Sequence, residues 1–366
     1  MKKYDFLIVG SGFAGSVSAR ELAELGYKVL IIDKRDHIGG NAYDYYDKFG
    51  NLVHKYGPHI FHTNSKKIFT YLSRFTEWRY YSHMVKVSDK NQLYPFPINR
   101  LTLNQFFKIN LKESEVNDFI QSKLIKLNKI KNSEDYLFSV IGKELTDVFF
   151  RGYTKKQWSL DLSELDKSVA ARIPFRSSDD SRYFSDRYQY MPKNGYSQLF
   201  SNLLNHQNIK IELGFNFDEK VKSIAKKIIY TGPVDSYFNY KYGKLPYRSL
   251  EFKHINMDHS NFQSVGTINF PNQETYTRIT EFSHLTGITT KKTAIVKEYP
   301  TSKGDPYYPI PNETNKLLYQ KYYELCKSED NTFFIGRLAQ YKYYNMDQVI
   351  ASALSFINRE FKVVGK

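Results

Sequence analysis

Rings and cations alternate in one short stretch of the chain, FFRGYTKKQW, residues 149–158. Flat aromatic side chains such as Tyr153 and Trp158 can stack on a nucleic-acid base, but they are equally suited to packing in a core. We interpret Arg151, Lys155 and Lys156 as solvated charges that attract an anionic ligand at long range. By itself, the stretch leaves a base-binding site and an ordinary core segment open.

A glycine-rich turn near the N-terminus has the spacing of a dinucleotide-binding site. The pattern of apolar residues predicts a strand over 4–10, a helix over 13–25 and a second strand over 28–33. Gly10-Ser11-Gly12-Phe13-Ala14-Gly15 joins the first strand to the helix, and Asp33 ends the second strand. Such glycines let the backbone approach a pyrophosphate at the helix N-terminus, and the acid binds ribose hydroxyls.

The residues that follow favour a flavin over other dinucleotides. HIGGNAYDYY, residues 37–46, places Gly39-Gly40 just after the acid, where extra backbone amides suit a cofactor that lies extended along the sheet. A plain turn is the alternative for this glycine pair. Asp33 would repel a 2′-phosphate, although Lys34 and Arg35 leave room for one.

Charge and cysteine content limit the partners and the compartment. The formal charge of +15 suits nucleic acid, an anionic membrane or an acidic small molecule. Its densest run, Lys108–Asn132, mixes lysines with Leu and Ile at helical spacing, so we interpret it as a solvated helix face and predict no nucleic-acid partner. A single cysteine, Cys326, excludes an internal disulfide and favours a reducing, cytoplasmic compartment. No stretch has the length of a membrane span.

Beyond the first unit the pattern becomes helical and then strand-like. Residues 99–150 have helical periodicity, and the last of these helices is expected to begin with Ser133 as its N-cap and to continue through Val148. Short alternating runs at 80–97 and 246–300 predict an antiparallel sheet.

The end of the chain resembles a return to the first domain. A buried strand is expected over 332–335, followed by Gly336-Arg337 and a helix that begins near Asp347. The first domain would then be discontinuous in sequence.

A set of short motifs extends from one end of the chain to the other. In order, they are GSGFAG, IGGNAYD, YGPHIFHT, YPFPINRLTLNQFF, RGYTKKQW, RIPFR, DDSRYFSDRYQYMP, YTGPVD, YTRITE, DPYYPI and GRLAQYKYYNMD. Any one of them is ambiguous, but the ordered set resembles one family, the FAD-dependent UDP-galactopyranose mutases of prokaryotes.

The resemblance implies an α/β fold with a discontinuous Rossmann-type FAD-binding domain, a small helical domain and an antiparallel β-sheet domain. The expected bounds are 1–75, 192–240 and 325–366 for the FAD-binding domain, 98–165 for the helical domain, and 76–97, 166–191 and 241–324 for the sheet domain, which binds the substrate. A homodimer is also implied.

The resemblance further implies an intramolecular transferase that interconverts UDP-galactopyranose and UDP-galactofuranose, with no net redox, for cell-surface polysaccharide synthesis. In the family, N5 of reduced FAD attacks the anomeric carbon and expels UDP, and the sugar ring opens and recloses in the resulting adduct. The protein's part is then positioning and charge stabilisation. A dual-specificity mutase that also acts on UDP-N-acetylgalactosamine stays open.

The matched motifs imply a set of substrate residues. In the family, the equivalents of Tyr153 and Trp158 flank the uracil. Those of Arg172 and Arg278 bind the diphosphate, with Arg172 on or near a mobile loop. His62 is expected to line the sugar pocket beside the flavin, and it completes the predicted catalytic set with the two arginines. The other predicted substrate contacts are Phe149, Thr154, Tyr183, Phe184, Arg248, Asn269, Tyr308 and Tyr343.

The cofactor residues are implied in the same way. His59 is expected against the flavin, and the helix that opens at Met346 is expected to aim its amides at the ribityl-pyrophosphate. The full set is Gly10, Gly12, Phe13, Ala14, Gly15, Asp33, Lys34, Gly40, Asn41, His59, Ile60, Gly336, Arg337, Met346, Asp347 and Gln348, and no metal ligand is predicted. Asn345 departs from the family, in which we expect aspartate more often, and the change removes a charge near the sugar-phosphate region.

Two other functions fit a fold of this kind. FAD-dependent amine and polyene oxidases need an apolar substrate tunnel, whereas this chain offers paired arginines and tyrosines suited to a diphosphate. GDP-dissociation inhibitors of small GTPases are non-catalytic binding proteins of related fold, and they lack a complete flavin site. A yellow colour on purification would separate a flavoprotein from this last class.

Overall fold

The computed structural model describes residues 3–361. The first strands of the chain belong to a five-stranded parallel sheet. Its strands lie in the order β10-β2-β1-β11-β17, and each neighbouring pair is parallel. They are β1 (Tyr4–Val9), β2 (Val29–Asp33), β10 (Ile209–Leu213), β11 (Ala225–Tyr230) and β17 (Thr332–Phe334). The predicted return of the chain to the first domain is therefore confirmed, since β17 pairs with β11 at the edge of this sheet.

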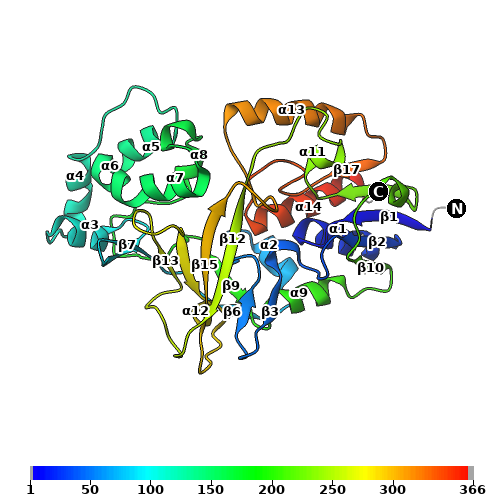
Figure 1. The fold of residues 1–366 in the computed structure, drawn as a ribbon, viewed down its shortest axis with the longest axis horizontal. Coiled ribbons are helices and arrows are strands. Elements are labelled where there is room, and N and C mark those ends of the chain that lie inside the picture. The colour runs from blue at the N-terminus through cyan, green and yellow to red at the C-terminus, as the bar shows by residue number, and fades with distance from the viewer. Residues whose placement is uncertain (1–2, 362–366) are drawn as a thin grey trace.

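Helices cover both faces of the parallel sheet because the side chains of β1 and β2 alternate between them. Ile8 and Ile31 join the larger hydrophobic core, whereas Leu7 and Leu30 form a separate cluster with Val221 on the opposite face. Figure 1 shows this layer with α1 and α14 beside the strands and α13 above α11. The helices of this part are α1 (Phe13–Glu24), α9 (Gly195–Leu204), α10 (Glu219–Lys222), α11 (Val234–Tyr237), α13 (Glu313–Lys327) and α14 (Met346–Glu360).

Two smaller sheets continue from the first layer. One is an antiparallel pair of β3 (Asp44–Tyr46) and β4 (Leu52–His54). The other has the order β5-β9-β6, which brings β9 (Tyr188–Pro192) between β5 (Phe61–Thr63) and β6 (Trp78–Tyr80). Helix α2 (Lys66–Leu72) follows β5, and a short 3₁₀ turn spans Gly40–Ala42.

A seven-stranded sheet in the order β16-β12-β15-β14-β13-β7-β8 forms the middle of the molecule. Its strands are β7 (Val85–Asp89), β8 (Gln92–Phe96), β12 (Tyr247–Asn256), β13 (Thr267–Asn269), β14 (Arg278–Glu281), β15 (Ala294–Thr301) and β16 (Tyr308–Pro309), and helix α12 (Phe282–Thr286) follows β14. The predicted antiparallel sheet is confirmed with one exception, because β13 pairs with β7 in parallel. No tight turn joins β7 to β13, so nothing forces that pair to be antiparallel.

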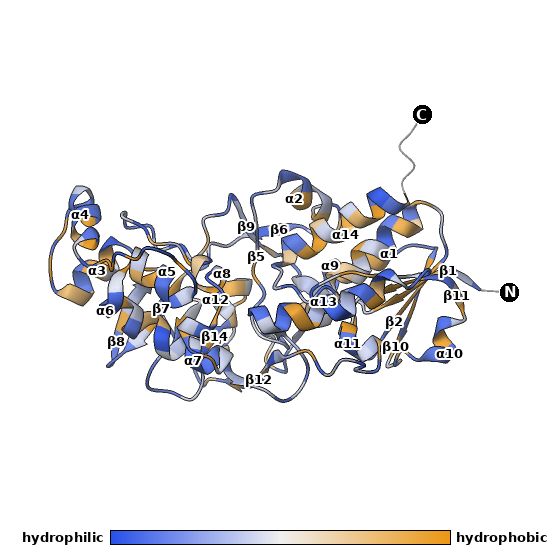
Figure 2. Ribbon diagram, turned by 90° about the horizontal axis from the view of Figure 1, so that it is seen from above, coloured by the Kyte–Doolittle hydropathy of each residue, from blue (hydrophilic) through white to orange (hydrophobic). Residues whose placement is uncertain are grey.

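A group of short helices lies at one end of the seven-stranded sheet. Figure 2 shows it at the opposite end of an elongated molecule from the parallel sheet. Its helices are α3 (Arg100–Phe107), α4 (Val116–Gln121), α5 (Ser133–Val140), α6 (Gly142–Thr146), α7 (Gly152–Trp158) and α8 (Ser168–Ala171), with a π-helical turn over Asp147–Arg151 and 3₁₀ turns over Glu113–Glu115 and Leu162–Glu164.

The prediction of one continuous helix up to Val148 is wrong. The helix is interrupted at Gly142, whose φ is +77°. Only glycine fits at this position, because a Cβ there would lie 2.3 Å from the carbonyl oxygen of Lys123. The N-cap is also shifted by one residue, since the side chain of Asn132, not that of Ser133, accepts the amide hydrogen of Asp135 at 2.8 Å.

The interpretation of Lys108–Asn132 as one helix face is also wrong for most of that run. Only α4 and the 3₁₀ turn before it are helical there. Val116 and Ile120 of α4 reach the core of the helical group, and the lysines follow an irregular path over the surface.

The domain bounds stay a proposal. We propose that 1–75, 192–240 and 325–366 form one unit, 98–165 a second, and 76–97, 166–191 and 241–324 a third; the first two and last five residues lie outside the described part. Strand β9 spans the proposed boundary at 191/192. It also joins two of the proposed units, because it pairs with both β5 and β6. Within residues 3–361, no helix combines the length and apolar character needed to cross a membrane.

Candidate functional site

The positions of Gly10 and Gly15 in the turn after β1 are packed too tightly to accept a side chain. Gly10 has a φ of +101°, and a Cβ on Gly15 would lie 1.9 Å from the carbonyl oxygen of Gly10. A Cβ on Gly40 would lie 2.9 Å from the Cα of Gly12, so the predicted second glycine turn meets the first one backbone to backbone. The N-cap of α1, Gly12, provides no side chain to accept the first amides of the helix. Bare amides next to a closely packed backbone fit the phosphates of a dinucleotide.

Asp33 is fixed beside this turn by three hydrogen bonds. One carboxylate oxygen accepts from the backbone amide of Ser11 at 2.8 Å and from its hydroxyl at 2.6 Å. The other accepts from the amide of Arg35 at 3.0 Å. The acid is buried at the end of β2, and it keeps acceptor capacity for a further hydroxyl group. Lys34 instead pairs with Asp305 at 2.7 Å, so its amine is directed to another acid in this structure.

The segment after β17 meets the start of α1 from the other side. Gly336 has a φ of +95°, and a Cβ there would lie 2.9 Å from the Cβ of Ala14. The side chains of Asp347 and Gln348, at the start of α14, are used locally: Asp347 accepts from the hydroxyl of Thr63 at 2.9 Å, and Gln348 accepts from the amide of Asn345 at 2.8 Å. The close approach of Gly336 to Ala14 fits a cofactor that lies extended across both segments.

Arg278, at the start of β14, is half-buried and held on one side only. Its Nε donates to a carboxylate oxygen of Glu298 at 2.6 Å, and Glu298 is buried on β15. Burial opposes the charge, but Glu298 and the hydroxyls of Tyr153 and Tyr308 raise the pKa of Arg278 well above its usual value. Among residues 3–361 its terminal amino groups make no hydrogen bond, so a fixed and permanently charged fork is available to an anion.

Three rings form a cluster, and one of them, that of Tyr308, interacts electrostatically with Arg278. Trp158 contacts Tyr343 edge to face at a centroid distance of 5.8 Å and Tyr308 at 6.3 Å, and the two tyrosines are 5.3 Å apart. They come from α7, β16 and the segment before α14, which are far apart in sequence. Trp158 is buried, and burial raises the pKa of Tyr308.

Two further arginines lie against the same rings. Arg337 lies 5.5 Å from the ring centre of Tyr308 and 5.8 Å from that of Tyr343, and its guanidinium donates to the carbonyl of Tyr344 at 2.6 Å. Arg172 follows α8, is exposed, and lies 4.0 Å from the ring centre of Tyr343 while donating to the side chain of Asn345. Asn345, where we expect the family to carry aspartate more often, thus contacts an arginine predicted to bind the diphosphate.

His62 lies in β5, and His59 lies two residues before the start of that strand. His62 is stacked on Phe184 at 3.7 Å, and its Nδ1 lies 2.9 Å from Asp186. Nδ1 of His59 donates to the carbonyl of Gly57 at 2.9 Å. Since a carbonyl only accepts, Nδ1 of His59 carries the proton and Nε2 is left as an acceptor. Burial lowers the pKa of His59 to about 3, with Arg337 and Arg278 adding to the effect.

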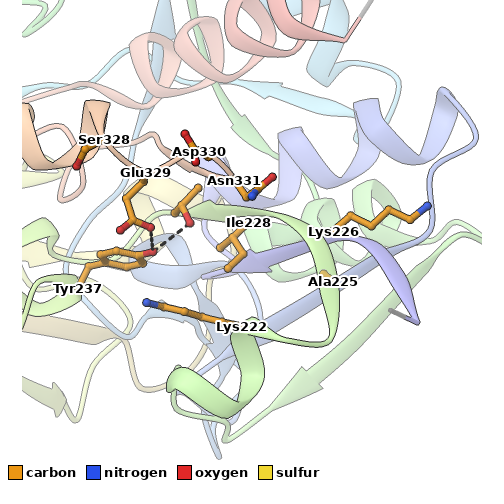
Figure 3. A pocket seen from close by; sticks show the side chains of 10 residues that line it. Lys222, Ala225, Lys226, Ile228, Tyr237, Ser328, Glu329, Asp330 and Asn331 are labelled. Carbon is orange, nitrogen blue, oxygen red and sulfur yellow. Dashed lines mark hydrogen bonds between the residues drawn. The ribbon is translucent and has the colours of Figure 1, made fainter. Parts of the chain in front are cut away.

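A surface pocket of about 360 Å³ lies elsewhere, at the opposite end of the parallel sheet. Figure 3 shows Tyr237 and Glu329 inside it, joined by a hydrogen bond of 2.6 Å. Tyr237 also contacts Thr332 at 3.0 Å, and Lys226 pairs with Asp5 at 2.8 Å. Several of its polar groups are already paired in this way, whereas the fork of Arg278 is free within the described residues, so we place the functional site at the cluster of rings and arginines.

Comparison with known proteins agrees with this geometry. A family model described as UDP-galactopyranose mutase matches residues 148–343, and one described as an NAD(P)-binding Rossmann-like domain matches residues 8–75. A probable UDP-galactopyranose mutase from Klebsiella pneumoniae is 39% identical over 361 residues, which are 97% of this chain and 94% of that protein. The chain belongs to the UDP-galactopyranose mutase family.

Other relatives of the mutase family define how far the likeness extends. A dTDP-fucopyranose mutase from Escherichia coli is 37% identical over 361 residues, 95% of this chain and 96% of that protein. A crystal structure of reduced UDP-galactopyranose mutase has a TM-score of 0.79 at 15% identity, covering 99% of this chain and 96% of the other, which supports the fold. With its family, this chain is an intramolecular transferase with a flavin or other nucleotide cofactor; the oxidase and GDP-dissociation inhibitor alternatives gain no support from these matches.

Some of the residues predicted from the mutase motifs lie in packed positions away from the exposed groups of the cluster. Phe149 is buried among Tyr94, Phe96 and Phe106 in the helical group, and Phe13 packs against Phe200. For these residues and for the buried Thr154, direct ligand contact stays a prediction.

Arg248 has a partner that the motifs did not indicate. It is buried on β12, and its guanidinium donates to the carbonyls of Gln157 at 2.8 Å and Lys156 at 3.3 Å, at the end of α7. Asn269 of β13 is paired in register with Arg278, which keeps it next to the arginine fork. Tyr183 meets Phe184 edge to face at 5.0 Å.

The interpretation of Lys156 as a solvated charge is wrong. Its amine is half-buried and donates to the carbonyls of Phe270, Glu274 and Tyr276, and burial lowers its pKa to about 8. Glu298 and Asp186 were missed as well. The available signals were an acid within the apolar run of β15 and the third acid in the motif DDSRYFSDRYQYMP.

Proposed function

We propose that this protein interconverts UDP-galactopyranose and UDP-galactofuranose and that its cofactor is FAD. The observation that carries the proposal is the ring cluster of Trp158, Tyr308 and Tyr343 together with the free fork of Arg278, which interacts electrostatically with Tyr308. A nucleoside diphosphate combines a flat base with a double negative charge, and rings and arginines are the matching protein groups.

The arginines are suited to the charge that develops during the reaction. As the bond between the anomeric carbon and the diphosphate oxygen breaks, the electron pair leaves with UDP, and its negative charge increases. Arg278 is already fixed by Glu298, so it can stabilise that charge without reorganising. Arg172 is exposed and held by a ring and an amide side chain, and we propose that it exchanges the contact with Asn345 for the phosphate.

The tyrosines contribute hydroxyl groups to the same anion. Burial raises the pKa of Tyr308 and of Tyr153, so both stay protonated at neutral pH and can donate hydrogen bonds to phosphate oxygens. We assign Trp158 and Tyr153 to the uracil, which is the role of the matching residues in the family.

The glycine turns, Asp33 and the start of α14 support FAD as the cofactor. When bound and reduced, the flavin would supply the electron pair for the bond that replaces the bond to UDP at the anomeric carbon. It would recover that pair at the end of the reaction, so no net redox change occurs. His59 and His62 lie next to the rings and arginines, and we propose that they line the space between flavin and sugar. Asp186 contacts Nδ1 of His62 and would set which nitrogen of that ring faces the sugar.

Product analysis tests the proposal. Anaerobic, dithionite-reduced protein should convert UDP-galactofuranose to UDP-galactopyranose for many turnovers per reduction, detected by chromatography, while strictly oxidised protein should be inactive. Consumption of one electron pair per product, or a colourless protein that cannot be reconstituted with FAD, would exclude it.

The same assay separates the nearest alternatives. dTDP-fucopyranose belongs in the substrate set because of the 37% identical relative from Escherichia coli, and a preference for it would place this chain with that enzyme. Action on UDP-N-acetylgalactosamine is not favoured by the names of the relatives described above. A homodimer and a cytoplasmic location stay predictions, which light scattering and fractionation would test.

A further inference from the structure

Helix α7 rests on the turn between β13 and β14 through one of its faces. Gly152 approaches that turn so closely that a Cβ there would lie 2.5 Å from both the carbonyl oxygen of Pro271 and the side-chain oxygen of Asn272. Lys156 lies one helical turn later, on the same face. Its amine donates to the carbonyls of Glu274 at 2.8 Å and Tyr276 at 3.2 Å, and also to that of Phe270.

This turn leads directly into Arg278. Asn269 ends β13, Arg278 begins β14, and the two residues are partners across the strand pair. The three carbonyls that Lys156 binds all lie in the eight residues between them. One ammonium group therefore spans both arms of the turn and joins it to the helix.

The rest of α7 carries the residues that we assign to the base. Tyr153 and Trp158 belong to this helix, and Arg248 of β12 holds its last turn through the carbonyls of Lys156 and Gln157. Lys155, by contrast, is exposed and pairs with the exposed Asp161 at 3.0 Å, so it fixes no neighbouring strand.

We propose that Lys156 is a positioning residue, which keeps the base-stacking rings of α7 at a fixed distance from the diphosphate arginine on β14. The inference rests on the proposed function, because it assumes that these rings and Arg278 bind the two ends of one nucleotide. Chain connectivity does not hold them together, since more than a hundred residues separate Trp158 from Arg278. A small displacement between two binding groups costs affinity for a ligand that must contact both.

Binding of UDP and of uridine separates positioning from simple folding. Uridine reaches only the rings, whereas UDP must reach the rings and Arg278 together. We expect Lys156→Met to weaken UDP binding about tenfold or more, because charge-assisted hydrogen bonds are lost, and to change uridine binding by less than about threefold. Lys156→Arg should restore most of the UDP affinity, since a guanidinium can also donate to several carbonyls.

Lys155→Met is the matched control, and it should bind both ligands as the parent does. Equal UDP affinities for Lys156→Met and Lys155→Met would overturn the proposal. So would a loss of UDP and uridine binding in equal proportion, which would mean that Lys156 only supports the rings.

Gly152→Ala gives a second route if Lys156→Met does not fold, because the added methyl group pushes the helix away from the same turn. A selective loss of UDP binding in Gly152→Ala would support the proposal, and an unchanged ratio of UDP to uridine affinity would contradict it. If the parent binds UDP but does not isomerise UDP-galactofuranose, the proposed function fails while the comparison of Lys156 with Lys155 still applies.

Discussion

The guanidinium of Arg278 is held in place at Nε, while its terminal amino groups, unpaired within the described part of the chain, are free to bind an anion. Glu298 takes the Nε side of its guanidinium, and the strand pair of β14 and β15 fixes the backbone below both residues. A buried acid with one cation as partner is costly to leave unpaired, so the two residues keep each other in place. If the free fork binds the diphosphate as we propose, it loses little conformational entropy when the anion arrives.

Removal of either diphosphate arginine should lower turnover as well as affinity. The leaving group gains charge only as the sugar bond breaks, so part of the stabilisation exists in the transition state alone. Arg172→Ala and Arg278→Ala should keep the flavin spectrum and lose most activity at saturating UDP-galactofuranose, and Lys should rescue each only in part. Steady-state kinetics of reduced enzyme give the values.

If both alanine variants reach the turnover number of the parent and only KM rises, the arginines bind ground state and transition state equally. Glu298→Gln offers a further comparison at Arg278, because it keeps the shape of the neighbour and removes the charge that holds the guanidinium.

Trp158 provides a second test at this scale. If its ring covers the uracil, Trp158→Ala should weaken UDP binding by about 1–3 kcal/mol and leave the flavin bound. The other tryptophan, Trp78, lies in the β5-β9-β6 sheet and is stacked on Phe61 at 5.0 Å, so Trp78→Phe is a suitable control. Unchanged UDP affinity in folded Trp158→Ala would make Trp158 a packing residue.

The helices and strands could be predicted where the local pattern of apolar residues and glycines matches the place of the element in the fold. The first βαβ unit, the strand at β17 and the start of α14 follow from apolar runs and glycines, because a buried parallel strand needs little else. The break at Gly142 was missed, since the carbonyl of Lys123 that enforces it lies outside the helical pattern. Lys156 was misassigned for the same reason: the carbonyls that surround it belong to residues more than a hundred positions away.

Site residues divide along the same line. Gly10, Gly12 and Asp33 carry a local motif with a physical meaning, so the sequence alone pointed to their role. Trp158, Arg278 and Tyr343 each belong to short motifs that meet only in the folded molecule, and only the family resemblance brought them together. Glu298 and Asp186 act through the residues they hold, so no motif indicated them.

Gly15→Ala tests the packing of the turn between β1 and α1. Its methyl group would lie 1.9 Å from the carbonyl oxygen of Gly10, so the helix must move away from the strand. We expect flavin content to fall by most of its value and the melting temperature to drop by several degrees, as for other overpacked sites. Absorbance at the flavin bands and thermal unfolding measure the two effects.

Gly50→Ala is the matched control, because Gly50 has a φ of +85° but no atom within 4 Å of its missing Cβ. It should cost about 1 kcal/mol through backbone strain and leave flavin content unchanged. Equal flavin loss in the two variants would mean that cofactor binding does not depend on this close approach.

Across the whole molecule, several histidines are neutral in the folded state. Burial lowers the pKa of His54, His59 and His83 to about 3, below the usual value near 6.5. The unfolded chain therefore binds more protons between these two values, so the free energy of unfolding should fall as the pH drops from about 6.5 towards 3. The loss should be on the order of 1–3 kcal/mol per histidine at pH 4.

Imidazole NMR shifts measure this directly. At pH 5 the rings of His54, His59 and His83 should be neutral, whereas His284, whose pKa is raised by its contact with Glu281, should already be protonated. Protonation of the first three rings near pH 6.5 in folded protein would contradict the prediction.

The order of strands in the parallel sheet also affects how the chain emerges from the ribosome. Strand β1 lies between β2 and β11 rather than at an edge, and β11 begins only at residue 225. At about 5–20 residues per second, the interval between the synthesis of β2 and that of β11 is on the order of tens of seconds. During that time β1 presents an apolar, hydrogen-bonding edge with no partner, which is the kind of surface that holding chaperones bind. A ribosome stalled before β11 should therefore carry a chaperone-bound nascent chain, and a chain released after β17 should not.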